Sequence, residues 1–212
     1  MDYNTRRKLK KNKHGAFMGI GLYNKKDNPK IYSIWQQMIY RVYEDSKDKK
    51  PTYQNCKVCD EWLCFQNFAS WYVKNHPNDG NNYHLDKDIV FKDNKEYSPN
   101  KCFFVPQSIN KLLTNRKRFR GDYPVGVHVP ETYIKNGDIK YQAGCSNGKG
   151  KIIRGKVRET MLDAFIDYST IKKNIILEQL EIYKNVLDEK VYNSLKNYVI
   201  IDDTIYKLHE KV

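Results

Sequence analysis

The sequence predicts an α+β chain built from two modules, and three observations support this fold class. Apolar and aromatic residues recur at helical spacing between residues 33 and 72. Residues 83–110 then combine an alternating strand pattern, a polar turn and a helix-start signal. After residue 124, short strand-like segments separated by glycine-containing turns lead into a long apolar helical stripe. With 212 residues, 40% of them hydrophobic, the chain can bury two cores.

The first predicted elements are a basic arm with a loop, over residues 1–30, and two helices. One helix is predicted to begin at Ser33, which has capping-box spacing with Gln36, and to end near Tyr43. Its apolar face follows the i, i+3, i+4, i+7 pattern of Trp35, Met38, Ile39 and Val42. The second helix is indicated by Trp62, Phe65, Phe68 and Trp71. We expect the tryptophans to lie in the core rather than to stack on bases.

The segment that starts at Tyr83 is predicted to form a strand, a turn and a helix. Because side chains alternate along a strand, one face receives His84, Asp86 and Asp88, and the other receives Leu85, Ile89 and Phe91. We expect the first face to carry the catalytic side chains and the second to pack in the core. The turn is predicted at Asp93-Asn94, and a helix is predicted to start at Ser98 as cap with Pro99 in the first helical position.

The polar face of this strand has the residue types that phosphodiester cleavage requires. That reaction needs an activated water, positive charge on the phosphate oxygens and help for the leaving group. Asp86 and Asp88 are hard oxygen ligands, so we predict that they hold Mg²⁺ or Mn²⁺ with an amide oxygen from Asn94 or Asn100. His84 is the candidate general base. The alternative is that the polar face is only the solvent side of an edge strand and that Asn94 is a turn former.

Charge points to a polyanionic partner, chiefly nucleic acid. The formal net charge is +13 and the pI is near 9.3. Besides the arm, an acid-free run with the appearance of a phosphate-tracking linker contains Lys111, Arg116, Lys117, Arg118 and Arg120. A basic surface without a partner is the alternative. A membrane partner is not expected, since no basic amphipathic helix with an apolar face is found. A small-molecule substrate is not expected either.

The second module is predicted to be a three-stranded sheet backed by a helix. The expected strands are 125–129, 139–145 and 152–157, with hairpin turns at Asn136-Gly137 and at residues 147–150. Thr160 with Asp163 marks the start of the helix. Its apolar stripe is formed by Ala164, Tyr168, Ile171 and Ile175, continued by Leu180, Tyr183 and Leu187.

Cysteine usage favours free thiols in a reducing compartment, because the five cysteines are an odd number in a chain of this length. Cys56 and Cys59 form a Cys-x-x-Cys pair, and Cys64 and Cys102 are candidates to complete a structural Zn²⁺ site. The two close pairs of a four-cysteine site are missing, so we favour small buried thiols over zinc. Nucleotide-binding, esterase and metalloprotease motifs are not found.

Residues 32–110 resemble phage and bacterial HNH-type homing endonucleases of the His-Me finger superfamily. The resemblance rests on Tyr32 to Met38, Arg41, Tyr43, Tyr53, Val58 to Trp62, Phe65, Phe68, Leu85 to Ile89, Asn94-Lys95, Tyr97 to Pro99, Cys102, Val105-Pro106 and Asn110. The second module is similar to the DNA-binding domain of plant ethylene-response factors at Tyr123 to Val127, Lys140 to Ala143, Ala164-Phe165, Tyr168 and Val191 to Leu195. That likeness implies DNA contacts from His128, Lys140, Gln142, Lys149, Lys151, Arg154 and Lys156.

The resemblance implies a ββα-metal finger that hydrolyses double-stranded DNA in a bacterial or phage-infected host cytoplasm, with Asn110 at the position of the later finger asparagine. The strand has a single histidine, His84, and the final metal-binding histidine of better-known fingers is not found. Two alternatives therefore stay open: a DNA-binding regulator or competitor without cleavage, and an interaction protein with an acidic protein partner. The expected organisation is arm (1–30), nuclease domain (31–114), basic linker (115–124), DNA-binding domain (125–200) and tail (201–212).

Overall fold

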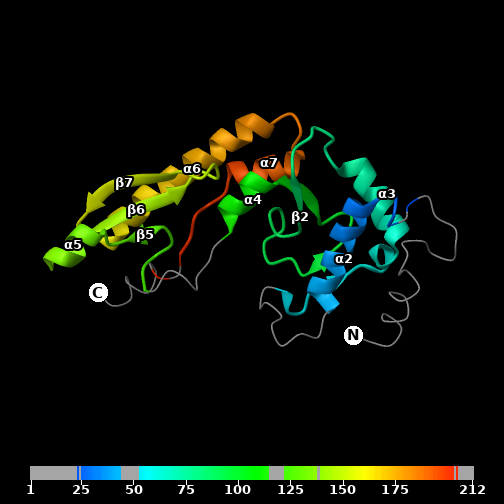
Figure 1. The fold of residues 1–212 in the computed structure, drawn as a ribbon, viewed down its shortest axis with the longest axis horizontal. Coiled ribbons are helices and arrows are strands. Elements are labelled where there is room, and N and C mark those ends of the chain that lie inside the picture. Colours follow the sequence, from blue (N-terminus) through cyan, green and yellow to red (C-terminus); the bar gives the residue numbers. More distant parts are fainter. Residues whose placement is uncertain are drawn as a thin grey trace. The chain divides into compact units, whose positions relative to one another are not determined.

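The protein has an α+β fold, as the sequence predicts, and its internal contacts divide it into two units, Met1–Val105 and Pro106–Val212 (Figure 1). Each unit is described by itself. The computed structural model describes residue 23, residues 25–43, 53–114, 122–137 and 139–202, and residue 204. Most of the predicted arm and linker therefore lies outside the described residues, including Arg116, Lys117, Arg118 and Arg120.

The first unit consists of short strands held on an aromatic helical core. Its elements are α2 (Pro29–Tyr43), β1 (Lys57–Val58), the 3-10 helix η2 (Asp60–Leu63), α3 (Phe65–Asn75), β2 (Tyr83–Asp86), β3 (Glu96–Tyr97) and β4 (Phe103–Pro106). The strands form two separate pairs. In one, β1 lies parallel to β3, and in the other β2 is hydrogen-bonded to β4.

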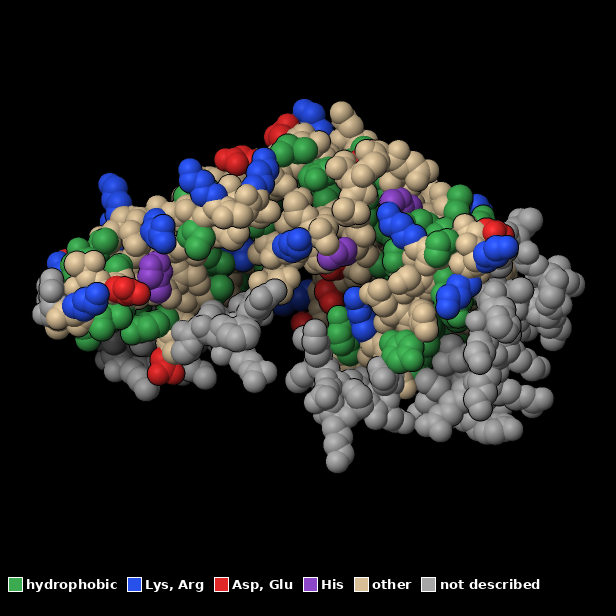
Figure 2. Space-filling view, in the orientation of Figure 1, with side chains coloured by type: hydrophobic (Ala, Val, Ile, Leu, Met, Phe, Trp, Pro, Cys, Tyr) green, Lys and Arg blue, Asp and Glu red, His purple; other side chains and the backbone are tan. Residues whose placement is uncertain are grey.

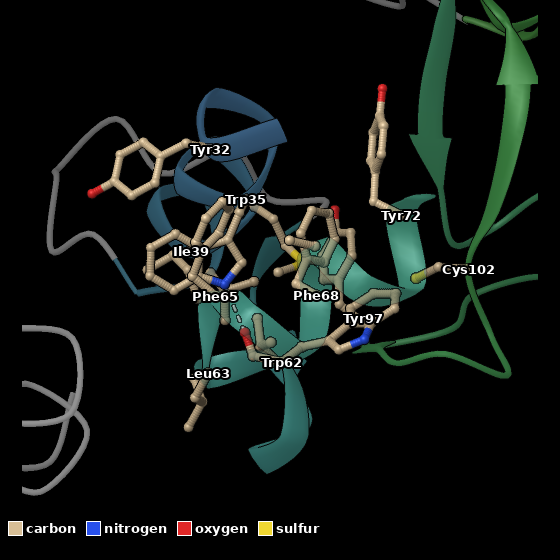
Figure 3. Packing of buried hydrophobic residues seen from close by; sticks show 14 of the residues in the cluster. Tyr32, Trp35, Ile39, Trp62, Leu63, Phe65, Phe68, Tyr72, Tyr97 and Cys102 are labelled. Carbon is tan, nitrogen blue, oxygen red and sulfur yellow. Dashed lines mark hydrogen bonds between the residues drawn. The ribbon is translucent and has the colours of Figure 1, made fainter. Parts of the chain in front are cut away.

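Aromatic side chains from α2, η2 and α3 fill the core of this unit (Figure 3). The ring of Trp35 lies 5.6 Å from that of Phe65, and its Nε1 donates a hydrogen bond of 2.7 Å to the Trp62 carbonyl. Trp62 is fully buried, and Trp71 stacks on Phe104 at 5.1 Å. The expectation that the tryptophans belong to the core is confirmed. Such aromatic pairs add packing energy beyond that of simple burial.

Three predicted boundaries in this unit are wrong. Helix α2 begins at Pro29 instead of Ser33, because proline suits the first helical position; the Ser33 hydroxyl instead accepts from Gln37 within the helix. The strand ends at Asp86, and Phe91 is exposed rather than part of the core.

The third wrong boundary is the helix expected at Ser98 and Pro99. The amides of Lys101 and Cys102 both donate to the Ser98 carbonyl, which closes a single turn. The apolar residues that follow then form β4 beside β2. A helix begins only after Pro106, so the chain order is β2, β3, β4 and then the helix.

The second unit contains one sheet and four helices among its described residues. In chain order these are α4 (Gln107–Leu113), β5 (Val127–His128), α5 (Glu131–Asn136), β6 (Tyr141–Ser146), β7 (Ile152–Arg158), α6 (Met161–Tyr183) and α7 (Glu189–Lys196). The sheet is antiparallel in the order β5-β6-β7, and α6 runs along one of its faces (Figure 1).

The buried face of the sheet packs on the first half of α6. Ala143 and Cys145 of β6 share a core with Ala164, Phe165 and Tyr168 of the helix. The loop before β5 approaches α6 closely at Gly126, whose φ is +73°, and a Cβ built there would lie 2.0 Å from the Tyr168 ring. Only glycine meets both the left-handed backbone and this lack of space.

The predicted signals of this unit are confirmed in two places and wrong in one. Thr160 caps α6 by accepting from the Asp163 amide, and the turn before β7 is a hairpin closed by a hydrogen bond from the Asn147 amide to the Lys151 carbonyl. At Asn136-Gly137, however, the chain forms no hairpin. The residues before it form α5, and Gly137 ends this helix in the left-handed region at φ +73°.

Contacts place the start of the second unit earlier than the sequence does. Leu112 of α4 is buried in the same core as Val127 and Ala143, so α4 packs with the sheet and α6. Asp202, in the predicted tail, accepts a 2.9 Å hydrogen bond from the Val125 amide and is almost fully buried. By its internal contacts the second unit begins at Pro106, whereas the sequence-based prediction places α4 in the nuclease domain of residues 31–114.

Candidate nuclease finger and DNA-binding sheet

His84 and Asp86 share one partly exposed face of β2. Their neighbours on the strand point the other way, since Tyr83 is buried and Leu85 packs against the aromatic core. The alternation predicted for this strand is therefore present from Tyr83 to Asp86, and it presents the candidate base and the first candidate metal ligand on the same side.

The strand ends at Asp86 because the side chain of this residue forms a turn with the backbone that follows. Its Oδ1 accepts hydrogen bonds of 2.8 Å from the amides of both Asp88 and Ile89. This is the local bonding by which aspartate competes with regular secondary structure. The expectation that Asp88 lies on the same strand face is wrong, because Asp88 belongs to the turn; the two carboxylates remain close in sequence and space.

The Asp86 carboxyl is held in an environment that disfavours its charge. Burial is the largest cause and raises its pKa, and the nearby Asp88 carboxylate raises it further. The two amide hydrogen bonds and the Lys87 ammonium oppose this shift but do not reverse it. A cation bound to Asp86 would favour the charged form.

Lys87 is a central residue of the turn that the sequence interpretation missed. Its side chain is only 4% exposed, and its Nζ donates to Asp88 Oδ1 and to the Asn94 carbonyl, both at 2.6 Å. The ammonium also lies 5.8 Å from the centre of the Tyr97 ring. One signal was available: strand alternation places residue 87 on the apolar face with Leu85, where a lysine is unusual.

Asn94 uses both ends of its amide inside the turn. Nδ2 donates to the carbonyls of Lys87 (3.0 Å) and Glu96 (2.8 Å), while Oδ1 accepts from the Glu96 amide at 3.0 Å. The preceding Asp93 has a positive φ of 59°, which aspartate tolerates. These bonds assign Asn94 the turn-forming role that the sequence left as the alternative.

Asn110 lies in α4, in the second unit, where it is partly buried and its carbonyl accepts from the Thr114 hydroxyl at 3.1 Å. The expected assistance of Asn110 to the finger stays a prediction.

The side chains near β2 supply only the smallest number of ligands with which proteins usually bind a magnesium-type cation. Magnesium is usually bound through one or two carboxylates with water and substrate phosphate, and Asp86 and Asp88 supply that number. Asn94 Oδ1 already accepts from the Glu96 amide, so only one of its two lone pairs remains for a cation. Within the described part of the chain, no three His, Cys, Asp or Glu residues group as a metal site would.

The cysteines of this unit show the features of structural thiols. Cys56 and Cys102 are buried, and burial raises the pKa of Cys102 to about 12. Cys59 and Cys64 are partly exposed, and burial also raises the pKa of Cys59.

On the second unit, three predicted DNA contacts come together on the sheet face that turns away from α6. His128 is paired with Gln142, and Gly144, two residues further along β6, is paired with Arg154. The His128 ring lies over Gly144, because a Cβ atom built on this glycine would be 3.4 Å from His128 Cε1. Burial lowers the pKa of His128, and Arg154 lowers it further, which shows that these two side chains are neighbours.

The remaining predicted contacts of this unit do not all lie on that face, since Lys156 neighbours Asp167 of α6. Lys149, Lys151 and Lys156 are exposed in the hairpin turn and on β7, whereas Lys140 is bound to Glu159 at 2.8 Å. Residues 139–158 contain no Asp or Glu. Figure 2 shows more Lys and Arg than Asp and Glu side chains on the face in view.

Comparisons with known protein families, curated proteins and solved structures found no match to this chain. Among the residues that the structure describes, no helix has the length and apolar character needed to cross a membrane.

Proposed function

We propose that the protein is a metal-dependent endonuclease that hydrolyses phosphodiester bonds in double-stranded DNA. The observation that supports it most is the shared face of β2, where His84 and Asp86 lie together with Asp88 in the adjoining turn. A base and a pair of carboxylates close together are the minimum that metal-assisted hydrolysis requires. Along the chain, the paired strands β2 and β4 are separated by the two-residue strand β3 and followed by α4, an order that resembles a ββα finger with one short insertion.

In this proposal each side chain has a defined role. His84 accepts the proton of the attacking water, and Asp86 and Asp88 hold Mg²⁺ or Mn²⁺. The bound cation supplies positive charge to the phosphate oxygens. Lys87 and Asn94 are positioning residues, because they hold the turn from within.

The sheet of the second unit is proposed to bind the DNA. Arg154 and Gln142 have the hydrogen-bonding groups that read base edges in the major groove, and His128 lies beside Arg154 on the same face. The exposed lysines around this face would contact phosphates, which fixes position without reading sequence. An acid-free sheet face avoids repulsion between carboxylates and the DNA backbone.

A DNA-binding protein without cleavage is the second candidate, and one observation favours it. Asp88 is ion-paired with a buried lysine and Asn94 is hydrogen-bonded within the turn, so few ligands remain for a cation. In that case the finger would be a scaffold, and the protein would act as a regulator or competitor at its DNA site.

Supercoiled plasmid distinguishes these functions. Wild-type protein is incubated with Mg²⁺, with Mn²⁺ or with a chelator, and nicked and linear products are measured. Asp86→Asn and Asp88→Asn should abolish metal-dependent cleavage and preserve DNA binding. Asp93→Asn, which makes the same charge change in the same turn at a residue whose positive φ asparagine tolerates, should cleave normally.

Each outcome of this assay has a clear meaning. Binding that weakens with salt while the plasmid stays intact under every metal would support the non-cleaving function. Wild-type cleavage that persists in both aspartate variants would contradict the assigned site. A protein without salt-sensitive DNA affinity would contradict both functions and favour an acidic protein partner.

A further inference from the structure

Next to the turn of residues 87–94, two lysines bind a single glutamate at the edge formed by β1 and β3, and a third lysine precedes that glutamate in the chain. Lys57 is paired with Glu96 across these strands, and its ammonium lies 3.2 Å from Glu96 Oε1. Lys101 approaches the other oxygen, Oε2, at 2.6 Å. Lys95 precedes Glu96 and is exposed, and its carbonyl accepts from the Lys57 amide at 2.8 Å. We refer to Lys57, Lys95 and Lys101 as the lysine edge.

The lysine edge keeps excess positive charge at neutral pH. The pKa of Glu96 lies below its ordinary value, chiefly because the Lys101 and Lys57 ammonium groups hydrogen-bond to it. An ionised Glu96 therefore neutralises one of three lysines and leaves two positive charges. The Lys57 side chain is 68% exposed and that of Lys101 is 45% exposed, so the charge faces solvent while the glutamate restricts where the ammonium groups lie.

The same asparagine connects the lysine edge to the candidate cleavage site. The Asn94 side chain bonds both to Lys87, next to Asp86 and Asp88, and to the backbone of Glu96. Lys87 itself is too buried to meet a ligand. Lys92 is also exposed in this turn, and the exposed lysines at the edge are further cations that can meet a phosphate beside the two carboxylates.

We infer that Lys57, Lys95 and Lys101 form a phosphate-contacting surface of the first unit, which holds the DNA backbone next to Asp86 and Asp88. The inference rests on the proposed function and extends it to residues outside the basic linker and the sheet. The physical reason is that a carboxylate pair repels a phosphate, so cleavage requires nearby cations that offset this repulsion. Glu96 orients the lysines instead of contacting DNA.

A triple substitution tests the inference. The variant Lys57→Gln, Lys95→Gln, Lys101→Gln is compared with Lys26→Gln, Lys30→Gln, Lys74→Gln, which removes the same charge from exposed lysines of the same unit. Binding to a short duplex is measured by fluorescence anisotropy over a series of KCl concentrations. Since each phosphate contact contributes about 0.9 to the salt slope, the lysine-edge variant should lose about 2 to 3 in slope and the control less than about 1.

Cleavage provides a second readout with the same pair of variants. At limiting plasmid concentration the lysine-edge variant should cleave more slowly than the control, and at saturating plasmid the two should approach each other. Equal salt slopes for the two triple variants would overturn the inference, because net charge alone would then account for binding. If the triple variant fails to fold, Lys95→Gln alone keeps both ion pairs of Glu96 and should lower the slope by about 1; an unchanged slope would overturn the inference.

The inference and the proposed function fail in different ways. Wild-type protein that neither cleaves nor binds DNA contradicts both. Wild-type protein that cleaves and binds with salt sensitivity, together with a lysine-edge variant that behaves like wild type, contradicts only the lysine edge.

Discussion

Replacing Asn94 with alanine should destabilise the first unit strongly, because this side chain makes three hydrogen bonds inside the finger turn. They connect it to the Lys87 carbonyl and to both backbone groups of Glu96, at 2.8 to 3.0 Å. A hydrogen bond contributes about 1 kcal/mol net to stability, so the loss amounts to about 3 kcal/mol of unfolding free energy. Water that reaches this partly buried turn would lower the loss to about 2 kcal/mol.

Tryptophan fluorescence reports on the first unit alone, since the three tryptophans of the chain are Trp35, Trp62 and Trp71. Urea unfolding followed by this signal therefore measures the change directly. Asn100→Ala, in the exposed turn before β4, is the matched control and should change stability by less than about 0.5 kcal/mol. If Asn94→Ala unfolds like the control and yet loses metal-dependent cleavage, the turn-forming role is refuted and Asn94 acts as a ligand.

Three further outcomes are expected. Burial, and after it the Lys30 charge, lowers the pKa of His76, so the unfolded chain binds a proton at this histidine more readily than the folded chain does. The free energy of unfolding should therefore be fully retained above about pH 6.5 and should fall as the pH drops below that value. The fall should be smaller in His76→Gln, as urea unfolding at each pH would show. An unchanged pH profile in that variant would exclude His76 as the cause. Gly126→Ala should cost about 2 to 4 kcal/mol in urea unfolding followed by far-ultraviolet circular dichroism, since the methyl would overlap Tyr168 at a left-handed φ; a loss below about 1 kcal/mol would show that the loop relaxes. Arg154→Gln should lower duplex affinity about tenfold or more in anisotropy titrations, and equal affinity would remove the sheet face from the DNA site.

The sequence predicts best those elements whose hydrogen bonds join residues close together in the chain. Thr160 and Asp163 lie three residues apart, and their capping bond starts α6 as expected. The turn before β7 is likewise closed within five residues. The aromatic cores follow from helical spacing, which needs no knowledge of the partner helix.

The elements that were missed depend on partners distant in sequence or on single side chains. Residues 103–106 form a strand because β2 offers them hydrogen bonds, which a turn signal at Ser98 does not reveal. The strand ends at Asp86 because one carboxylate oxygen binds two amides of the next residues. In the candidate site, the strand pattern correctly predicts that His84 and Asp86 share one face. It does not predict the buried Lys87, because the ammonium of this residue is covered by the turn that contains its acceptor, the Asn94 carbonyl.

The contacts at Leu112 and Asp202 decide how the second unit can be moved between proteins. A fragment cut at residues 125–200 would lose the buried Leu112 and the carboxylate that binds the Val125 amide. It would leave an apolar gap in the core where Leu112 packs, and it would leave the Val125 amide without its acceptor. A transferable form of the second unit must therefore begin with α4 and continue past Asp202, because a fusion that contained only the three strands and α6 would carry an incomplete core.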